Sequence, residues 1–292
     1  MAYTLELDFN RDFDTILISE LATHGMVVDP SEPSDTIRRK YFNYKKRAVE
    51  PVPRTVHISN EFTCPAVHQA ALDTIKETLG RGDEITAYLS ARLHNLDYSD
   101  PMLNDWGIHH LHLGTTVRAD GFMQRTGPLL FVRFDKKNAY LINVYAHGAW
   151  TKKDILLILH RNWPDTIADY RLRGIEGIEH DASEGEIGQL RGMGVNTLVQ
   201  VEPGAVYTSI GGGVTTARTS TDVTRLVMEY SRRIAEFEEI ARKNAELIGD
   251  DASSASGQTI DPLRLELLIE DHTYYIRELS TDYCYKLGQL GG

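Results

Sequence analysis

The chain is poor in cysteine, in long apolar runs and in positive charge. Its 292 residues include two cysteines, Cys64 and Cys284, which is too few for a disulfide scaffold or a four-thiolate zinc site. Two isolated thiols are typical of a reducing compartment, so we expect a cytoplasmic protein. No apolar run approaches the roughly 18 residues of a membrane span, and the N-terminus is acidic where a signal peptide would be basic and then apolar. We therefore expect no membrane contact.

The charge is negative overall and unevenly distributed. The formal net charge of −11, from 31 basic and 42 acidic residues, argues against general nucleic-acid binding. Residues 1–37 carry a net −7, residues 38–54 carry +6, residues 55–164 are neutral and residues 165–292 carry −10. The basic concentration is therefore the segment 38–54.

The segment 38–54 interleaves cations with aromatic rings. Cations bind phosphates and aromatic faces accept stacked bases, so this pattern is typical of an arm that contacts RNA. A second interpretation is a solvated strand or helix whose rings enter the core and whose bases pair with the acidic first 37 residues. The predicted substrate-binding cations are Arg38, Arg39, Lys45 and Lys46, and the rings are Tyr41, Phe42 and Tyr44.

Helical and strand periodicities both occur along the chain, which predicts an α+β fold. The first short helical pattern ends at Gly25. Two longer helical patterns follow, and the periodicity changes from helix to strand near residue 106. The expected helices comprise residues 18–25, 64–82, 83–96, 150–164, 183–194 and 220–249, and the expected strands comprise 106–113, 129–135, 139–147, 196–210 and 263–288.

Three consecutive regions are predicted from these elements. Residues 1–67 form an acidic N-terminal helix and the basic arm. Residues 68–164 form an α+β core, in which an antiparallel β-meander packs with helices. Residues 165–292 form a second α+β region with one long helix and a C-terminal β-hairpin, and the stretch 250–259 within it has the composition of a flexible linker.

Histidines are concentrated on the first strand of the predicted meander, in the sequence IHHLHL of residues 108–113. Alternate side chains of a strand share a face, so His110 and His112 point one way and His109 the other. His147, at the end of the third strand, lies on the same polar face as Tyr145. If the meander brings these faces together, three imidazoles converge. Such a cluster acts as general acid and base, binds a metal, or consists of structural histidines bonded to neighbouring strands.

Cations flank the same predicted sheet. Arg125 precedes the second strand, Arg133 lies on it, and Lys152 and Lys153 open the helix after the third strand. A helix N-terminus has unpaired main-chain donors and the positive end of the helix dipole, which favours an anion there. The pattern predicts a phosphate-binding pocket, and the alternative is a pair of exposed first-turn lysines.

The order of elements over residues 68–163 resembles the RelE-type and HigB-type ribonuclease toxins. The similar layout is two helices, a strand with polar positions, the strand LLFVRFD, a strand ending AYLINVYAHG and a helix opened by TKKD. The chain is larger than that family and has histidines on the first strand, where the family usually has Glu or Arg. The resemblance implies RNA as substrate, a protein partner such as an antitoxin, and no cofactor. It also implies Arg133, Lys152 and Lys153 as phosphate binders and His147 and His112 as proton-transfer groups.

These observations predict a metal-independent endoribonuclease of toxin or anti-phage type. In that chemistry a base takes the proton of a ribose 2′-hydroxyl, an acid protonates the leaving 5′ oxygen, and cations stabilise charge on phosphorus. Two alternatives remain: a non-enzymatic interaction or regulatory protein with structural histidines, and a hydrolase with a histidine-ligated metal. The predicted catalytic residues are His110, His112, His147 and Arg133, and the predicted substrate-binding residues of this region are Arg125, Lys152, Lys153 and Tyr145.

Two further stretches carry weaker signals. The glycine-rich sequence SIGGGVTTARTSTD at residues 209–222 either binds an anion or makes a tight turn into a helix. Asp97, Asp100 and Asp105 are compatible with a metal, but the turn and cap signals around them favour a solvated loop.

Overall fold

The computed structural model describes residues 3–289, which form two compact units. Unit 1 consists of the residues up to Phe42 together with those from Arg225 onward, and unit 2 is Asn43–Thr224. The fold class is α+β, as predicted. The units do not follow the three consecutive regions expected from the sequence, because N-terminal and C-terminal segments pack together. Strand β1 (Leu5–Glu6) pairs in parallel with β8 (Leu263–Glu270), a contact that no local pattern encodes.

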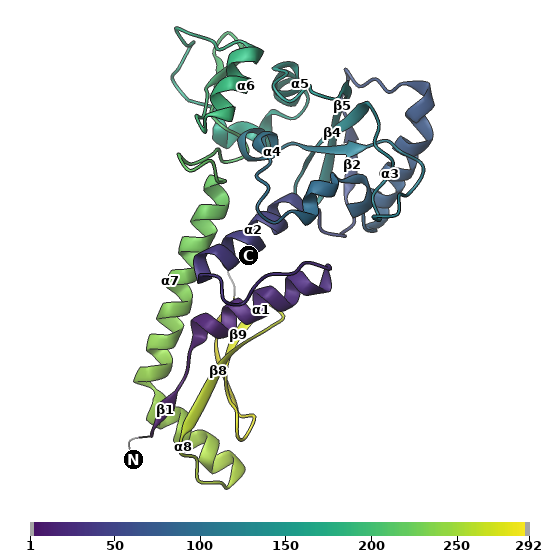
Figure 1. Ribbon diagram of the computed structural model, residues 1–292. Coiled ribbons are helices and arrows are strands. Elements are labelled where there is room, and N and C mark those ends of the chain that lie inside the picture. Colours follow the sequence, from purple (N-terminus) through teal and green to yellow (C-terminus); the bar gives the residue numbers. More distant parts are fainter. Residues whose placement is uncertain (1–2, 290–292) are drawn as a thin grey trace. The chain divides into compact units, whose positions relative to one another are not determined.

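Unit 2 is built on a four-stranded sheet of order β2-β5-β4-β3. Figure 1 labels its strands β2, β4 and β5. Strands β3, β4 and β5 form the predicted antiparallel meander. Strand β2, which was not predicted, adds to its edge in parallel with β5. The first meander strand starts later than expected, because Trp106 ends a helix and Gly107 follows with a left-handed φ of 64°. The strand bounds are β2 Thr55–Ile58, β3 His109–His112, β4 Pro128–Phe134 and β5 Asn138–Ala146.

Helices cover the two faces of this sheet, with α3 on one side and α5 on the other (Figure 1). Helix α3 ends at Gly82 in a left-handed cap, as predicted. The helix predicted over 83–96 is wrong, since only two 3₁₀ segments form there. Ser90 is extended and its side chain accepts a hydrogen bond from the Arg92 N–H, which competes with helix continuation. The bounds are η1 Ala66–His68, α3 Gln69–Arg81, η2 Thr86–Tyr88, η3 Ala91–His94, α4 Pro101–Trp106, α5 Asp154–Asn162 and η4 Pro164–Tyr170.

The rest of unit 2 follows the sequence pattern closely. Helix α6 (Glu184–Gly192) begins at Ser183, whose side chain and that of Glu186 form a capping box. Strands β6 (Val199–Glu202) and β7 (Ala205–Tyr207) pair across the predicted Glu-Pro-Gly-Ala turn. A shared core joins α5, α6 and these strands to the α5 side of the sheet.

Unit 1 contains a sheet of order β1-β8-β9-β10. Its C-terminal strands form the predicted antiparallel hairpin, with Asp271 and His272 at positive φ in the β8–β9 turn. The long helix α7 is present, but the predicted linker is largely helix α8, because Ile248 and Ala252 are buried in the core. The bounds are α1 Phe9–Thr23, α2 Ser34–Arg47, α7 Thr221–Lys243, α8 Ala245–Ser256, β9 Thr273–Glu278 and β10 Cys284–Gln289. None of the helices within residues 3–289 is long and apolar enough to span a bilayer.

Candidate functional site

A cavity of about 470 Å³ lies in unit 2, and its walls come from the β3–β5 sheet, the η3–α4 segment and α6. This volume is in the range of pockets that enclose one small ligand. His110 and His112 on β3 and His147 directly after β5 all line it, so the predicted meander places the three imidazoles on one cavity. The polar and aromatic residues beside them include Arg92, Tyr98, Asp100, Arg125, Trp150 and Arg191.

The register of the meander explains why two histidines enter the cavity and one does not. In the antiparallel ladder His110 lies opposite Phe131 and His112 opposite Leu129, so these side chains share the face that packs toward α5. His109 points to the other face, where its ring meets Phe134 edge to face at 5.3 Å. Neither His109 ring nitrogen has a hydrogen-bond partner, and burial lowers the pKa of His109 to about 4.

His112 is held as a neutral ring. Burial lowers its pKa to about 4, and the nearby His110 and Arg125 act in the same direction. The main-chain N–H of Thr126 donates a long hydrogen bond of 3.4 Å to Nδ1 of His112, so the ring hydrogen is on Nε2. Transfer of that proton from a neutral imidazole is unfavourable. The geometry therefore favours His112 as a hydrogen-bond donor instead of the proton-transfer group predicted from the sequence.

Trp150 connects the other two histidines. Its ring lies 4.8 Å from that of His110 and 5.1 Å from that of His147. Burial lowers the pKa of His110, whose Nδ1 has no hydrogen-bond partner, whereas His147 is exposed. The main-chain N–H of His147 donates to the Gly127 carbonyl at 2.7 Å, which fixes the start of its loop.

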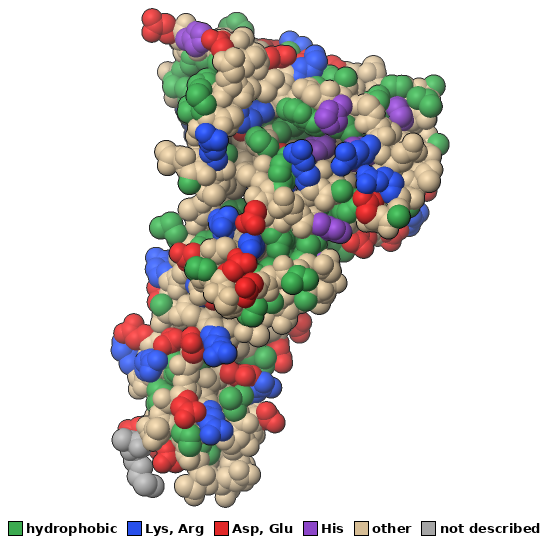
Figure 2. All heavy atoms as spheres, viewed as in Figure 1, with side chains coloured by type: hydrophobic (Ala, Val, Ile, Leu, Met, Phe, Trp, Pro, Cys, Tyr) green, Lys and Arg blue, Asp and Glu red, His purple; other side chains and the backbone are tan. Residues whose placement is uncertain are grey.

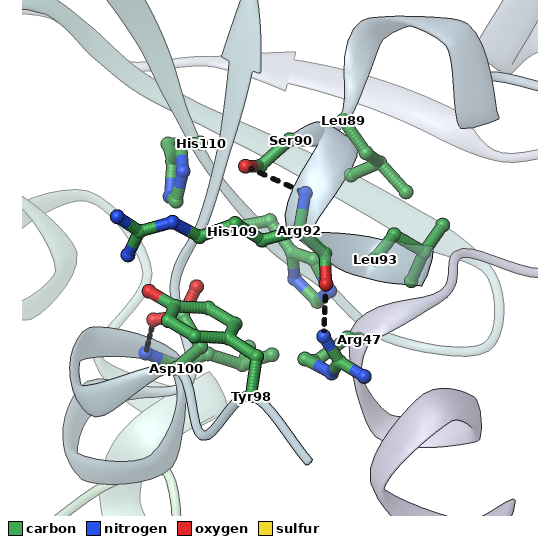
Figure 3. A pocket seen from close by; sticks show the side chains of 10 residues that line it. Arg47, Leu89, Ser90, Arg92, Leu93, Tyr98, Asp100, His109 and His110 are labelled. Atoms are coloured by element: carbon green, nitrogen blue, oxygen red, sulfur yellow. Dashed lines mark hydrogen bonds between the residues drawn. The ribbon is translucent and has the colours of Figure 1, made fainter. Parts of the chain in front are cut away.

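Two exposed arginines supply positive charge to the cavity. Arg125 was predicted, whereas Arg92 was missed, because the segment that carries it was interpreted as a regular helix. The Arg92 guanidinium lies 4.8 Å from the Tyr98 ring centre, and Figure 3 shows its side chain running between His110 and Tyr98. Among the described residues of the lining, Asp100 is the one acid. Its Oδ1 already accepts the N–H groups of the first turn of α4, at 3.1 and 3.0 Å.

A buried ion pair supports the cavity from α6. Arg191 donates to Asp105 from Nε at 3.0 Å and from Nη2 at 2.7 Å, and it donates to the main-chain oxygen of Trp150 from Nη1. Asp105 also accepts from Ser209 at 2.6 Å. The solvated loop predicted around Asp105 is therefore wrong for this residue, which is 4% exposed, whereas Asp100 caps α4 as the sequence indicated.

Four predicted residues of the core region lie outside the cavity lining. Arg133 donates to the Thr166 carbonyl at 3.3 Å. Lys153 pairs with Asp181 at 2.6 Å. Lys152 lies 5.3 Å from the ring centre of Tyr145, whose hydroxyl donates to Asp154. The contacts of Lys152, Lys153 and Tyr145 lie at the start of α5, and that of Arg133 lies at η4. The geometry therefore gives no support to the predicted catalytic role of Arg133 or to the predicted substrate-binding roles of Lys152, Lys153 and Tyr145.

Residues 38–47 of the basic arm lie in helix α2, and two of the predicted RNA contacts there are internal. Arg38 is 2% exposed and its Nε donates to Asp14 at 2.9 Å. This pairing with the acidic N-terminal segment agrees with the second interpretation of the arm. Lys46 donates to Asp222 at 2.9 Å and to the Gly211 carbonyl at 2.7 Å.

The two remaining cations of the predicted arm also lie on α2, where Arg39 is partly exposed and Lys45 is exposed. The glycine-rich stretch makes a tight turn, because Gly212 has a φ of 91° and a Cβ there would lie 2.5 Å from the Asp222 carboxylate. The structure thus gives that stretch a packing role.

Within residues 3–289, no group of three or more His, Cys, Asp or Glu side chains is arranged so that it could hold a metal ion. Comparisons of the chain with protein-family models, with curated proteins and with solved structures found no match.

Proposed function

We propose that unit 2 is an endoribonuclease whose acid–base chemistry needs no metal. The observation that carries this proposal is the cavity in which His110, His112 and His147 meet Arg92 and Arg125. Imidazoles hold or move protons near neutral pH, and guanidinium groups bind phosphate. A phosphodiester next to a ribose hydroxyl is a substrate that uses both kinds of group at once.

His147 is the proposed general base, because it is the exposed imidazole of the three. It accepts the proton of the 2′-hydroxyl while the 2′ oxygen attacks phosphorus. The bond from phosphorus to the 5′ oxygen then breaks, and the 5′ oxygen takes up a proton from water. His112 donates a hydrogen bond from Nε2 to a phosphoryl oxygen, and Arg125 balances the charge that develops there.

The biological setting that fits this chemistry is a cytoplasmic toxin or an anti-phage effector, with RNA as substrate and a protein antitoxin as partner. The part of the element order that still resembles RelE-type and HigB-type toxins, three antiparallel strands followed by helix α5, supports this setting. The net negative charge of the residues of unit 1 fits a regulatory or assembly role for that unit.

The test is cleavage of total RNA by the purified full chain in the presence of a chelator. His147→Gln should lower the cleavage rate by roughly 10²-fold or more while the protein stays folded by circular dichroism. His180→Gln, which changes an exposed histidine outside the cavity lining, should cleave like the wild type. Cleavage that the chelator abolishes would instead favour a metal-dependent hydrolase. A complete lack of cleavage would favour the non-enzymatic interaction protein.

A further inference from the structure

The size of the cavity limits what it encloses. At about 470 Å³ it lies in the range of pockets that take one small molecule, and a single nucleotide belongs to that size class. Gly188 and Gly192 on α6 contribute wall without side chains, and a Cβ at Gly192 would meet no atom within 4 Å. This part of the wall is therefore open to a ligand.

The charge of the lining selects an anion. Arg92 and Arg125 are exposed, and the acid of the described lining, Asp100, has Oδ1 engaged by main-chain N–H groups. The guanidinium of Arg191 donates to Asp105 and to a main-chain oxygen, so its hydrogen bonds support the cavity wall and are not directed to a ligand. One phosphate group between the two exposed arginines suits this arrangement.

The remaining wall is apolar and aromatic. Trp150, Met102 and Leu129 line the same cavity as the histidines and arginines. The flat face of a nucleobase stacks on aromatic side chains and packs against apolar ones, which displaces water from both surfaces. Together with the two preceding features, this describes a pocket for one nucleotide that carries one phosphate close to the imidazoles.

We infer that this cavity also hydrolyses 2′,3′-cyclic nucleoside monophosphates to nucleoside 3′-monophosphates. The inference rests on the proposed function, because it uses the same imidazoles and because attack by a 2′-hydroxyl on RNA leaves a cyclic phosphate at the new end. A water oxygen bonds to phosphorus and gives its proton to His147. The bond from phosphorus to the 2′ oxygen breaks, and that oxygen takes up a proton from solvent. Water is the co-reactant, so no oxidant, reductant or further group is required.

The experiment uses the full chain, 2′,3′-cyclic CMP and a chelator, with the phosphorus followed by NMR. The signal of 2′,3′-cyclic CMP should convert to that of 3′-CMP. The signal of 3′,5′-cyclic CMP should persist, because its 2′ oxygen is not bonded to phosphorus and cannot leave. His147→Gln should slow the conversion by about 10²-fold, and His180→Gln should leave it unchanged. Arg125→Ala should raise KM about tenfold, whereas Arg81→Ala, at an exposed arginine paired with Asp83, should not.

The outcomes separate the two proposals. RNA cleavage together with an unchanged 2′,3′-cyclic CMP signal overturns the inference and leaves the endoribonuclease proposal standing. Conversion of the cyclic nucleotide without RNA cleavage supports the inference and overturns the endoribonuclease proposal. Conversion at the same rate in His147→Gln overturns the assignment to this cavity. If neither substrate reacts and calorimetry detects no binding of 3′-CMP, both proposals fail.

Discussion

Each unit contains a buried arginine–aspartate pair, and the two pairs are used differently. In unit 1 the Arg38–Asp14 pair lies within the packing of α1 and α2, and Arg38 also donates to Ser231 on α7. In unit 2 the Arg191–Asp105 pair borders the cavity and holds the main chain of Trp150. The same chemistry therefore stabilises a core in one unit and supports the walls of a candidate site in the other.

The units also differ in charge. Residues 1–42 and 225–292 carry 21 acidic and 12 basic residues, a net −9, whereas residues 43–224 carry 21 and 19, a net −2. Figure 2 shows histidine side chains near Lys and Arg on the surface that carries β2–β5, while acidic and basic side chains are interspersed on the surface that carries α1. The net charge of the whole chain thus conceals a cavity lined by two exposed arginines in the nearly neutral unit.

The largest expected effect comes from breaking either buried pair. Asp105→Ala and Asp14→Ala each leave a buried guanidinium without its partner, so each should lower the free energy of unfolding by about 3–5 kcal/mol. Urea denaturation monitored by circular dichroism measures this. A loss below about 1 kcal/mol in either variant would show that the arginine finds solvent or another partner.

A paired replacement sharpens the comparison between the units. The double variant Arg191→Met with Asp105→Leu replaces the ion pair by apolar residues of similar volume, which is often neutral for stability. We expect it to remain folded and to cleave RNA at least tenfold more slowly, because Trp150 loses the donor on its main-chain oxygen. The matched replacement Arg38→Met with Asp14→Leu should leave cleavage unchanged. Equal cleavage in both double variants would contradict the supporting role of Arg191.

The sequence was informative where the structure is local. Strand alternation placed His110 and His112 on one face, and the position of His147 at the end of the next-but-one strand brought it to the same cavity. The turn at Gly204 and the cap at Ser183 followed from residues with a clear conformational preference.

The sequence was least informative where contacts are distant along the chain. A run of cations suggested a surface arm, but Arg38 is buried in an ion pair with Asp14. Asp14 lies on a separate helix, 24 positions earlier, so the local pattern around Arg38 did not reveal the pair. Arg191 and Asp105 were not recognised as partners, since 86 positions separate them. The second half of helix α8 was missed, because the serine-rich composition of residues 250–259 hid the buried Ala252.

A smaller effect should follow from pH, and it arises in unit 2. His109 has a folded pKa of about 4 and an ordinary pKa near 6.5 when unfolded, so the unfolded state binds more protons between these values. The contribution of His109 to the free energy of unfolding is therefore fully present above about pH 6.5, and it is lost as the pH decreases toward 4. We expect a loss of about 2 kcal/mol from this residue between pH 7 and pH 4.5.

Urea denaturation across that pH range tests the assignment. His109→Gln removes one of the imidazoles whose pKa burial lowers and leaves His110 and His112 in place. The stability of the variant should therefore depend less steeply on pH than that of the wild type, whatever its stability at pH 7. His272→Gln, an exposed position in unit 1, should retain the wild-type pH dependence. An identical slope in His109→Gln and wild type would rule out burial of a neutral His109 as the cause.

The smallest expected effect concerns salt. Arg125→Ala should weaken RNA binding and reduce the slope of log affinity against log salt by about 0.7, the value for one phosphate contact on a single strand. Lys45→Ala, on the former candidate arm, should change the slope less. Fluorescence anisotropy with a labelled oligonucleotide at several salt concentrations measures both. A larger change for Lys45→Ala would return the RNA contact to α2.

We expect RNA to bind at the cavity of unit 2 and not on unit 1. Ultraviolet cross-linking of the full chain to RNA, followed by mass spectrometry of the cross-linked peptides, tests it most directly. We expect cross-links at Trp150, Tyr98 or the cavity histidines, and excess 3′-CMP should abolish them. Cross-links confined to peptides of unit 1, or cross-links in unit 2 that persist in excess 3′-CMP, would contradict it.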